Sequence, residues 1–138
     1  MKFLLDTNVV SELRKGSRAN EGVSAWCANA DPSDLFLSVL VVGELRQGIE
    51  QLRRRDPTAA QRLDRWLAVT VESYADRVIP IDGRVADLWG RLSVPDPLPP
   101  VDGLLAATAI AHGMTLVTRN VRQVERTGVD VHNPFSRP

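Results

Sequence analysis

The stretch FLLDTN, residues 3–8, decides how this chain folds. Three apolar residues run directly into a carboxylate, a hydroxyl and a carboxamide. A short, continuously apolar run that stops at a polar residue is typical of a buried strand, here predicted over residues 2–5. Asp6 therefore lies just past the C-terminal end of a first strand. A carboxylate in that place either caps the helix that follows or takes part in a site.

The rest of the chain alternates short apolar runs with helical patterns. Further strands are predicted over residues 35–38, 78–81, 115–117 and 129–131. Helices are predicted over residues 9–14, 21–29, 41–55, 58–74, 83–92 and 101–112. Thr58 is the predicted cap of the fourth helix, Gly113 stops the last one, and four prolines make residues 94–100 a loop. Alternating strands and helices indicate one α/β domain over residues 1–138, with a parallel sheet of about five short strands and helices on both faces.

Composition narrows the class of protein. The 17 basic and 17 acidic residues balance, so the chain is not a polycation that coats nucleic acid. A hydrophobic fraction of 43% is ordinary for a globular domain, and no apolar run is long enough to span a bilayer. The N-terminus lacks the plan of a signal peptide, and Cys27 is the single cysteine, which suits a reducing cytosol.

Three further polar residues occupy places comparable to that of Asp6. Glu44 follows a predicted strand inside an apolar run, Asp102 begins a very apolar helix, and Asn120 follows the strand at residues 115–117. Taken alone, each aspartate is as well explained as a helix cap as by a role in a site. Asn120 taken alone is explained as a turn residue or a cap. Glu44 is harder to explain in that way, because a carboxylate among apolar neighbours needs a partner or a cation. In a doubly wound sheet all four meet at one edge.

Carboxylates brought together repel each other and are stabilised by a divalent cation. Oxygen ligands without a nearby histidine or cysteine set favour Mg²⁺ or Mn²⁺ over zinc. Mg²⁺ keeps several waters and usually binds together with substrate phosphates. The pattern therefore predicts a metal-dependent site for phosphate chemistry, and neither His112 nor His132 belongs to it.

Four segments together resemble a PIN-domain ribonuclease, and more narrowly a VapC-type toxin of a bacterial toxin–antitoxin pair. They are LLDTNVVSEL, SVLVVGELRQGI, VDGLLAATAIAHGMTLVTRNVRQVE and VHNPF, in that order along the chain. The resemblance implies Mg²⁺- or Mn²⁺-dependent hydrolysis of RNA by a metal-activated water. By position it makes Asp6, Glu44, Asp102 and Asn120 the catalytic residues. Asp6 and Asp102 are the primary metal ligands, and Glu44 either binds the metal or orients a water.

The chain departs from the family pattern at two places. Asn120 stands where many relatives carry a fourth acid, and Gln123 where an aspartate is frequent. These departures leave open whether the site binds one metal ion or two. They also leave an alternative function open, a catalytically weak PIN-fold module that acts only through its antitoxin.

The same resemblance implies partners. Relatives form homodimers and are inhibited by a small VapB-like antitoxin, in a heterotetramer or a larger assembly in the bacterial cytoplasm. Candidate contacts for the RNA substrate are Thr7, Arg46, Arg53 and Arg119. The competing interpretation is that Arg46 and Arg53 lie on a solvated helix face, where Glu50 partly neutralises their charge.

Two other phosphate chemistries are excluded by missing residues. An aspartyl-phosphate phosphatase of the haloacid-dehalogenase type needs a second acid two residues after Asp6, where Asn8 stands. A phospho-receiver domain needs a late lysine, and the only lysines are Lys2 and Lys15.

Overall fold

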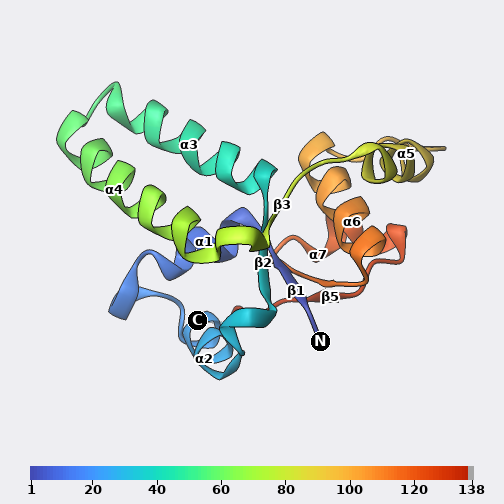
Figure 1. Cartoon of the computed structure of the whole chain (residues 1–138), viewed down its shortest axis with the longest axis horizontal. Coiled ribbons are helices and arrows are strands. Elements are labelled where there is room, and N and C mark those ends of the chain that lie inside the picture. The colour runs from blue at the N-terminus through green and yellow to red at the C-terminus, as the bar shows by residue number, and fades with distance from the viewer. Residues whose placement is uncertain (137–138) are drawn as a thin grey trace.

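A sheet of five parallel strands forms the centre of the protein (Figure 1). The computed structural model describes residues 1–136. The strands are β1 (Phe3–Leu5), β2 (Leu35–Ser38), β3 (Val78–Ile79), β4 (Thr115–Val117) and β5 (Val131–His132), in the order β3-β2-β1-β4-β5. In the central strand, Leu4 is paired with Phe36 on one side and with Leu116 on the other. The predicted α/β fold with a parallel sheet is confirmed.

The continuous apolar character of the strands follows from their position. Leu4 and Leu5 of β1 are fully buried, as are Leu37 of β2 and Val117 of β4. A strand covered on both faces has no polar side, so each of its positions is apolar. This is why FLL reads as an unbroken run rather than as an alternating one.

Within residues 1–136, seven α-helices surround the sheet. They are α1 (Thr7–Leu13), α2 (Glu21–Asn29), α3 (Val39–Arg53), α4 (Pro57–Tyr74), α5 (Gly83–Leu92), α6 (Pro100–His112) and α7 (Val121–Val124). In Figure 1, α3 and α4 form a long hairpin on one side of the strands, and α5 packs beside α6 on the other. Within residues 1–136, no helix combines the length and the apolar character that crossing a bilayer requires.

Most predicted elements are present, and the differences have local causes. The cap of α4 is Asp56, whose side chain accepts a hydrogen bond from the Ala59 amide at 3.1 Å, so the prediction of Thr58 as the cap is wrong. Pro57 begins this helix because the first helical position needs no amide hydrogen. The helix α6 begins one residue earlier than predicted, at Pro100, for the same reason.

The two elements after β4 differ more from the prediction. The four-residue helix α7 was not predicted, because one helical turn is too short to show a periodic pattern. The last strand lies at Val131–His132 rather than at residues 129–131. Val129 is buried although it lies outside the strand, so an apolar residue at this position does not mark where the strand begins.

The order of the strands indicates where a ligand would bind. After β1 the chain adds β2 and then β3 on one side of it, and later adds β4 and then β5 on its other side. The strand order therefore reverses between β1 and β4. In open parallel sheets, ligands bind beyond the carboxyl ends of the strands at such a point. The segments that leave this edge begin at Asp6 after β1 and at Thr118 after β4.

The C-terminal segment is held against α2 by close backbone packing at Gly22. A Cβ atom at Gly22 would lie 2.6 Å from the Ser136 amide nitrogen and in still closer contact with the Pro134 carbonyl. Gly22→Ala is therefore expected to destabilise the protein by about 1–3 kcal/mol, as overpacking commonly does. Chemical denaturation of the purified variant measures this change.

Gly90 provides the control for this prediction. It lies on the exposed side of α5, and a Cβ atom there meets nothing within 4 Å. Gly90→Ala should stabilise the helix by up to about 1 kcal/mol, because alanine loses less backbone entropy. Equal effects of the two substitutions would show that the tail does not pack on Gly22.

Candidate active site

Asp6 is a buried carboxylate that has three hydrogen-bond donors but no cationic partner among residues 1–136. Only 5% of its surface is exposed. As N-cap of α1, its Oδ1 accepts from the Thr7 amide at 2.7 Å. Its Oδ2 accepts from the Thr118 hydroxyl at 2.7 Å and from Asn8 Nδ2 at 3.3 Å. The capping interpretation thus holds for Asp6, but capping alone does not account for the side-chain donors on its second oxygen.

Thr118 connects the loops that follow β1 and β4. Its side chain is buried, and its oxygen accepts from the Asn120 amide at 2.9 Å while its hydroxyl donates to Asp6. Asn8 adds a second link, since its Oδ1 accepts from the Arg119 amide at 3.2 Å. Sequence reasoning missed Thr118 and Asn8 as site residues. The available signal was their position, directly after a strand in LVTRN and inside FLLDTN.

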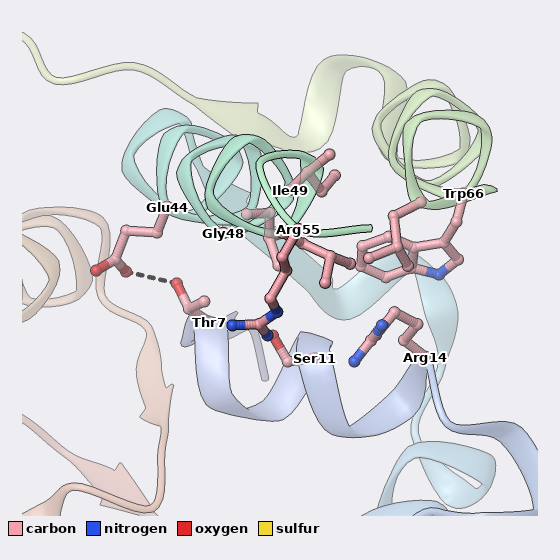
Figure 2. Close-up of a pocket in the computed structure, with 11 residues that line it drawn as sticks. Thr7, Ser11, Arg14, Glu44, Gly48, Ile49, Arg55 and Trp66 are labelled. Carbon is pink, nitrogen blue, oxygen red and sulfur yellow. Dashed lines mark hydrogen bonds between the residues drawn. The ribbon is translucent and has the colours of Figure 1, made fainter. Parts of the chain in front are cut away.

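Glu44 reaches the same edge from the second turn of α3. The Thr7 hydroxyl donates to Glu44 Oε1 at 2.5 Å, as Figure 2 shows. Because the Thr7 amide also binds Asp6, this one residue holds two carboxylates in place. Thr7, predicted as a substrate contact, thus has its hydroxyl engaged with an acid of the site.

Asp102 completes the group of acids. It is partly buried in the first turn of α6, whose N-cap is Pro99, so the capping interpretation does not apply to it. Burial raises the pKa of the Asp102 carboxyl, and the negative charges of Asp6 and Glu44 raise it further. The charges of Asp6 and Glu44 therefore both act on the Asp102 carboxyl.

The acids do not form a closed metal site in the described part of the chain. Among residues 1–136, no three histidine, cysteine or acidic side chains stand close enough together to hold an ion between them. Asn120 lies at the N-cap position of α7, but its side chain caps no backbone amide. Its carboxamide is therefore available to a water or a ligand.

The guanidinium groups of the predicted substrate arginines are engaged with other side chains. Arg46 and Arg53 of α3 both bind Asp64 of α4, at 2.6 and 2.7 Å, and both also bind Glu50. This network joins the two helices of the hairpin and neutralises the two cations, as the competing interpretation held. The guanidinium of Arg119 stacks on the Phe135 ring, 4.0 Å from its centroid.

A pocket of about 470 Å³ adjoins Glu44 and Thr7. It lies between α1 and the α3–α4 hairpin (Figure 2). Its walls are apolar along α3 and α4, at Leu45, Ile49 and Trp66. Arg14 and Arg55 point into it from the ends of α1 and α3.

The fold agrees with that of known proteins. The model of the PIN domain matches residues 3–129. The chain belongs to the PIN-domain family. This PIN domain is 34% identical to VapC ribonuclease Y4jK of Sinorhizobium fredii, over 96% of this chain and 97% of that protein. It is 32% identical to toxin FitB of Neisseria gonorrhoeae, over 96% and 98%.

Solved structures give the same relationship. The crystal structure of FitAcB from Neisseria gonorrhoeae matches this PIN domain with a TM-score of 0.87 and 32% identity, over 96% of this chain and 97% of that one. The structure of FitAB bound to the IR36 DNA fragment matches with the same TM-score and 30% identity, over 99% and 97%. Within its family this PIN domain thus groups with the VapC-type toxins, as the four sequence segments predicted.

Proposed function

We propose that this PIN domain is the toxin of a toxin–antitoxin pair and acts as a Mg²⁺-dependent endoribonuclease. The observation that carries the proposal is the approach of Asp6, Glu44 and Asp102 at the carboxyl edge of the sheet, where two of the charges raise the pKa of the third. Relatives named VapC ribonuclease, ribonuclease VapC14 and tRNA(fMet)-specific endonuclease VapC support the same class of reaction.

The donor set fits a hard divalent cation. It consists of oxygen atoms alone, and its mutual repulsion is relieved by positive charge. Mg²⁺ retains several waters, so the carboxylates need not enclose it by themselves. Asp6 and Asp102 would hold the ion, with Glu44 as a further ligand or through a water, and Mn²⁺ would substitute. Such an ion lowers the pKa of a water and offsets negative charge on the phosphate under attack.

The chain's own residues would position the reacting groups. Hydroxyl donors from Thr118 and Thr7 fix one oxygen each of Asp6 and Glu44, which directs the remaining lone pairs of these acids. The free Asn120 carboxamide would hold a water or a phosphate oxygen. These contacts cost no reorganisation during the reaction, because they are present before substrate binds.

A protein partner follows from the relatives rather than from any contact in this chain. The FitAB structures support an antitoxin as partner. We further propose that the antitoxin is small and inhibitory, and that this protein is a homodimer in a heterotetramer or larger complex. RNA would be the substrate, in the cytoplasm of a bacterium.

Removal of divalent metal tests the function. Purified protein is expected to cleave total RNA in Mg²⁺ or Mn²⁺ and to stop in excess chelator, because uncompensated carboxylates repel the phosphate. Restoring Mg²⁺ to the same sample should restore cleavage, which controls for loss of folded protein. Gel or end-mapping analysis of the RNA measures both.

Two outcomes would count against this proposal. Undiminished cleavage in chelator would exclude the metal-dependent mechanism. A folded protein that never cleaves RNA with Mg²⁺ present would favour the weak binding module instead.

A further inference from the structure

The two arginines of the pocket beside Glu44 carry uncompensated charge. Arg14 ends α1 and Arg55 follows α3, and both are exposed. Neither makes an ion pair with any residue from 1 to 136, whereas Arg46 and Arg53 share Glu50 and Asp64. Of these four arginines, Arg46 and Arg53 are neutralised, and the two that line the pocket are not.

The wall of the pocket therefore contains one carboxylate and two uncompensated cations. The Thr7–Glu44 hydrogen bond forms one end; in Figure 2 Arg14 lies away from it, while Arg55 reaches toward Thr7 and Ser11. Thr7 and Arg14 are seven residues apart, which is about 10 Å along a helix. Arg14 is therefore too far from the acids to contact the same atoms of a ligand, but it can contact the next part of a bound ligand.

We propose that this pocket binds the RNA strand beside the scissile phosphate, with Arg14 and Arg55 on backbone phosphates. The assignment rests on the proposed ribonuclease function. A strand whose phosphate lies among three carboxylates needs fixed cations outside that group, and arginine forks suit phosphate oxygens. A pocket of about 470 Å³ has room for a ligand of nucleotide size, and Trp66 in its wall offers an aromatic surface for a base.

An acidic protein segment would meet the same two cations. RNA is favoured because the pocket shares Thr7 and Glu44 with the acids, so its occupant continues directly from the position of the chemistry. Phosphates also recur along a strand, which matches two cations reached from two different helices.

Binding of fluorescent poly(U) RNA to the full chain tests the assignment. Arg14→Gln and Arg55→Gln should each weaken binding about tenfold, since hydrogen bonds to charged groups are worth at least that factor. Each should also make the slope of log affinity against log salt shallower by about 0.7, the loss of one phosphate contact on a single strand. Where cleavage is measured, KM should rise with kcat unchanged.

Arg46→Gln and Arg53→Gln are the matched controls. They remove the same charge from α3 but leave the pocket intact, so RNA affinity and salt slope should stay near wild-type values. Circular dichroism melts confirm that each variant is folded.

Two results would overturn the assignment. One is that the pocket variants behave like the controls toward RNA. The other is that they lose binding of poly-glutamate, used as an acidic peptide probe, while keeping binding of RNA. Because the assay measures binding, these results stand apart from the proposed function, which is tested by whether the wild type cleaves RNA and whether a chelator stops it.

Discussion

An Asp102→Asn variant is expected to lose RNA cleavage by more than about 100-fold while its metal-free form becomes more stable than the wild type. Loss of an outer partner of a metal ligand commonly costs roughly 10–100-fold, so loss of a ligand should cost more. The gain in stability has a separate cause. Burial and the charges of Asp6 and Glu44 disfavour the ionised Asp102 carboxyl in the folded protein.

The sign of this stability change depends on pH. The folded protein raises the pKa of Asp102 above that of the unfolded chain, so the folded state binds the proton more tightly. Stability is therefore lost as pH rises from the ordinary carboxyl value of about 4 through the raised one. At neutral pH asparagine removes this penalty, and near pH 4 the advantage of the variant should shrink.

Thermal unfolding in chelator at both pH values, paired with a cleavage assay in Mg²⁺, measures the two effects. Asp76→Asn is the control, because Asp76 is an exposed acid outside the site. A variant that cleaves RNA normally would remove Asp102 from the proposed site. A variant that melts below the wild type at neutral pH would contradict the electrostatic account.

Asp6→Asn is expected to abolish cleavage to a similar extent but to destabilise the protein. The Asp6 carboxylate accepts from the Thr7 amide, the Thr118 hydroxyl and Asn8 Nδ2. An amide group turns one acceptor oxygen into a donor and faces it toward other donors. A buried donor without an acceptor costs about 1–3 kcal/mol. The two aspartates, equivalent as sequence motifs, should therefore respond to the same substitution with opposite changes in stability.

Asp82→Asn is the matched control for Asp6→Asn. Asp82 caps α5 through a 2.9 Å bond from the Val85 amide, and it is exposed. Asparagine caps about as well as aspartate, so stability and cleavage should both stay near wild type. If Asp6→Asn also resembled wild type in both assays, the charge at the end of FLLDTN would be only a helix cap.

Local patterns in the sequence determined the elements of this fold. Helices α2 and α5 and strands β2 and β4 begin and end at the predicted residues, because caps, glycines and apolar runs act over a few residues. The position of Asp6, Glu44, Asp102 and Asn120 near one edge also followed from the sequence, since parallel strands bring their carboxyl ends together.

Only the tertiary structure decided which side chains these residues meet. Thr118 donates to Asp6 across 112 residues, and Thr7 to Glu44 across 37. Asp64 of α4 neutralises Arg46 and Arg53, while Arg14 and Arg55 come from different helices to one pocket. Strand pairing and the packing of α3 on α4 set these contacts. No local sequence pattern records the packing that brings such distant residues together, so the charges that remain uncompensated could be identified only in the folded chain.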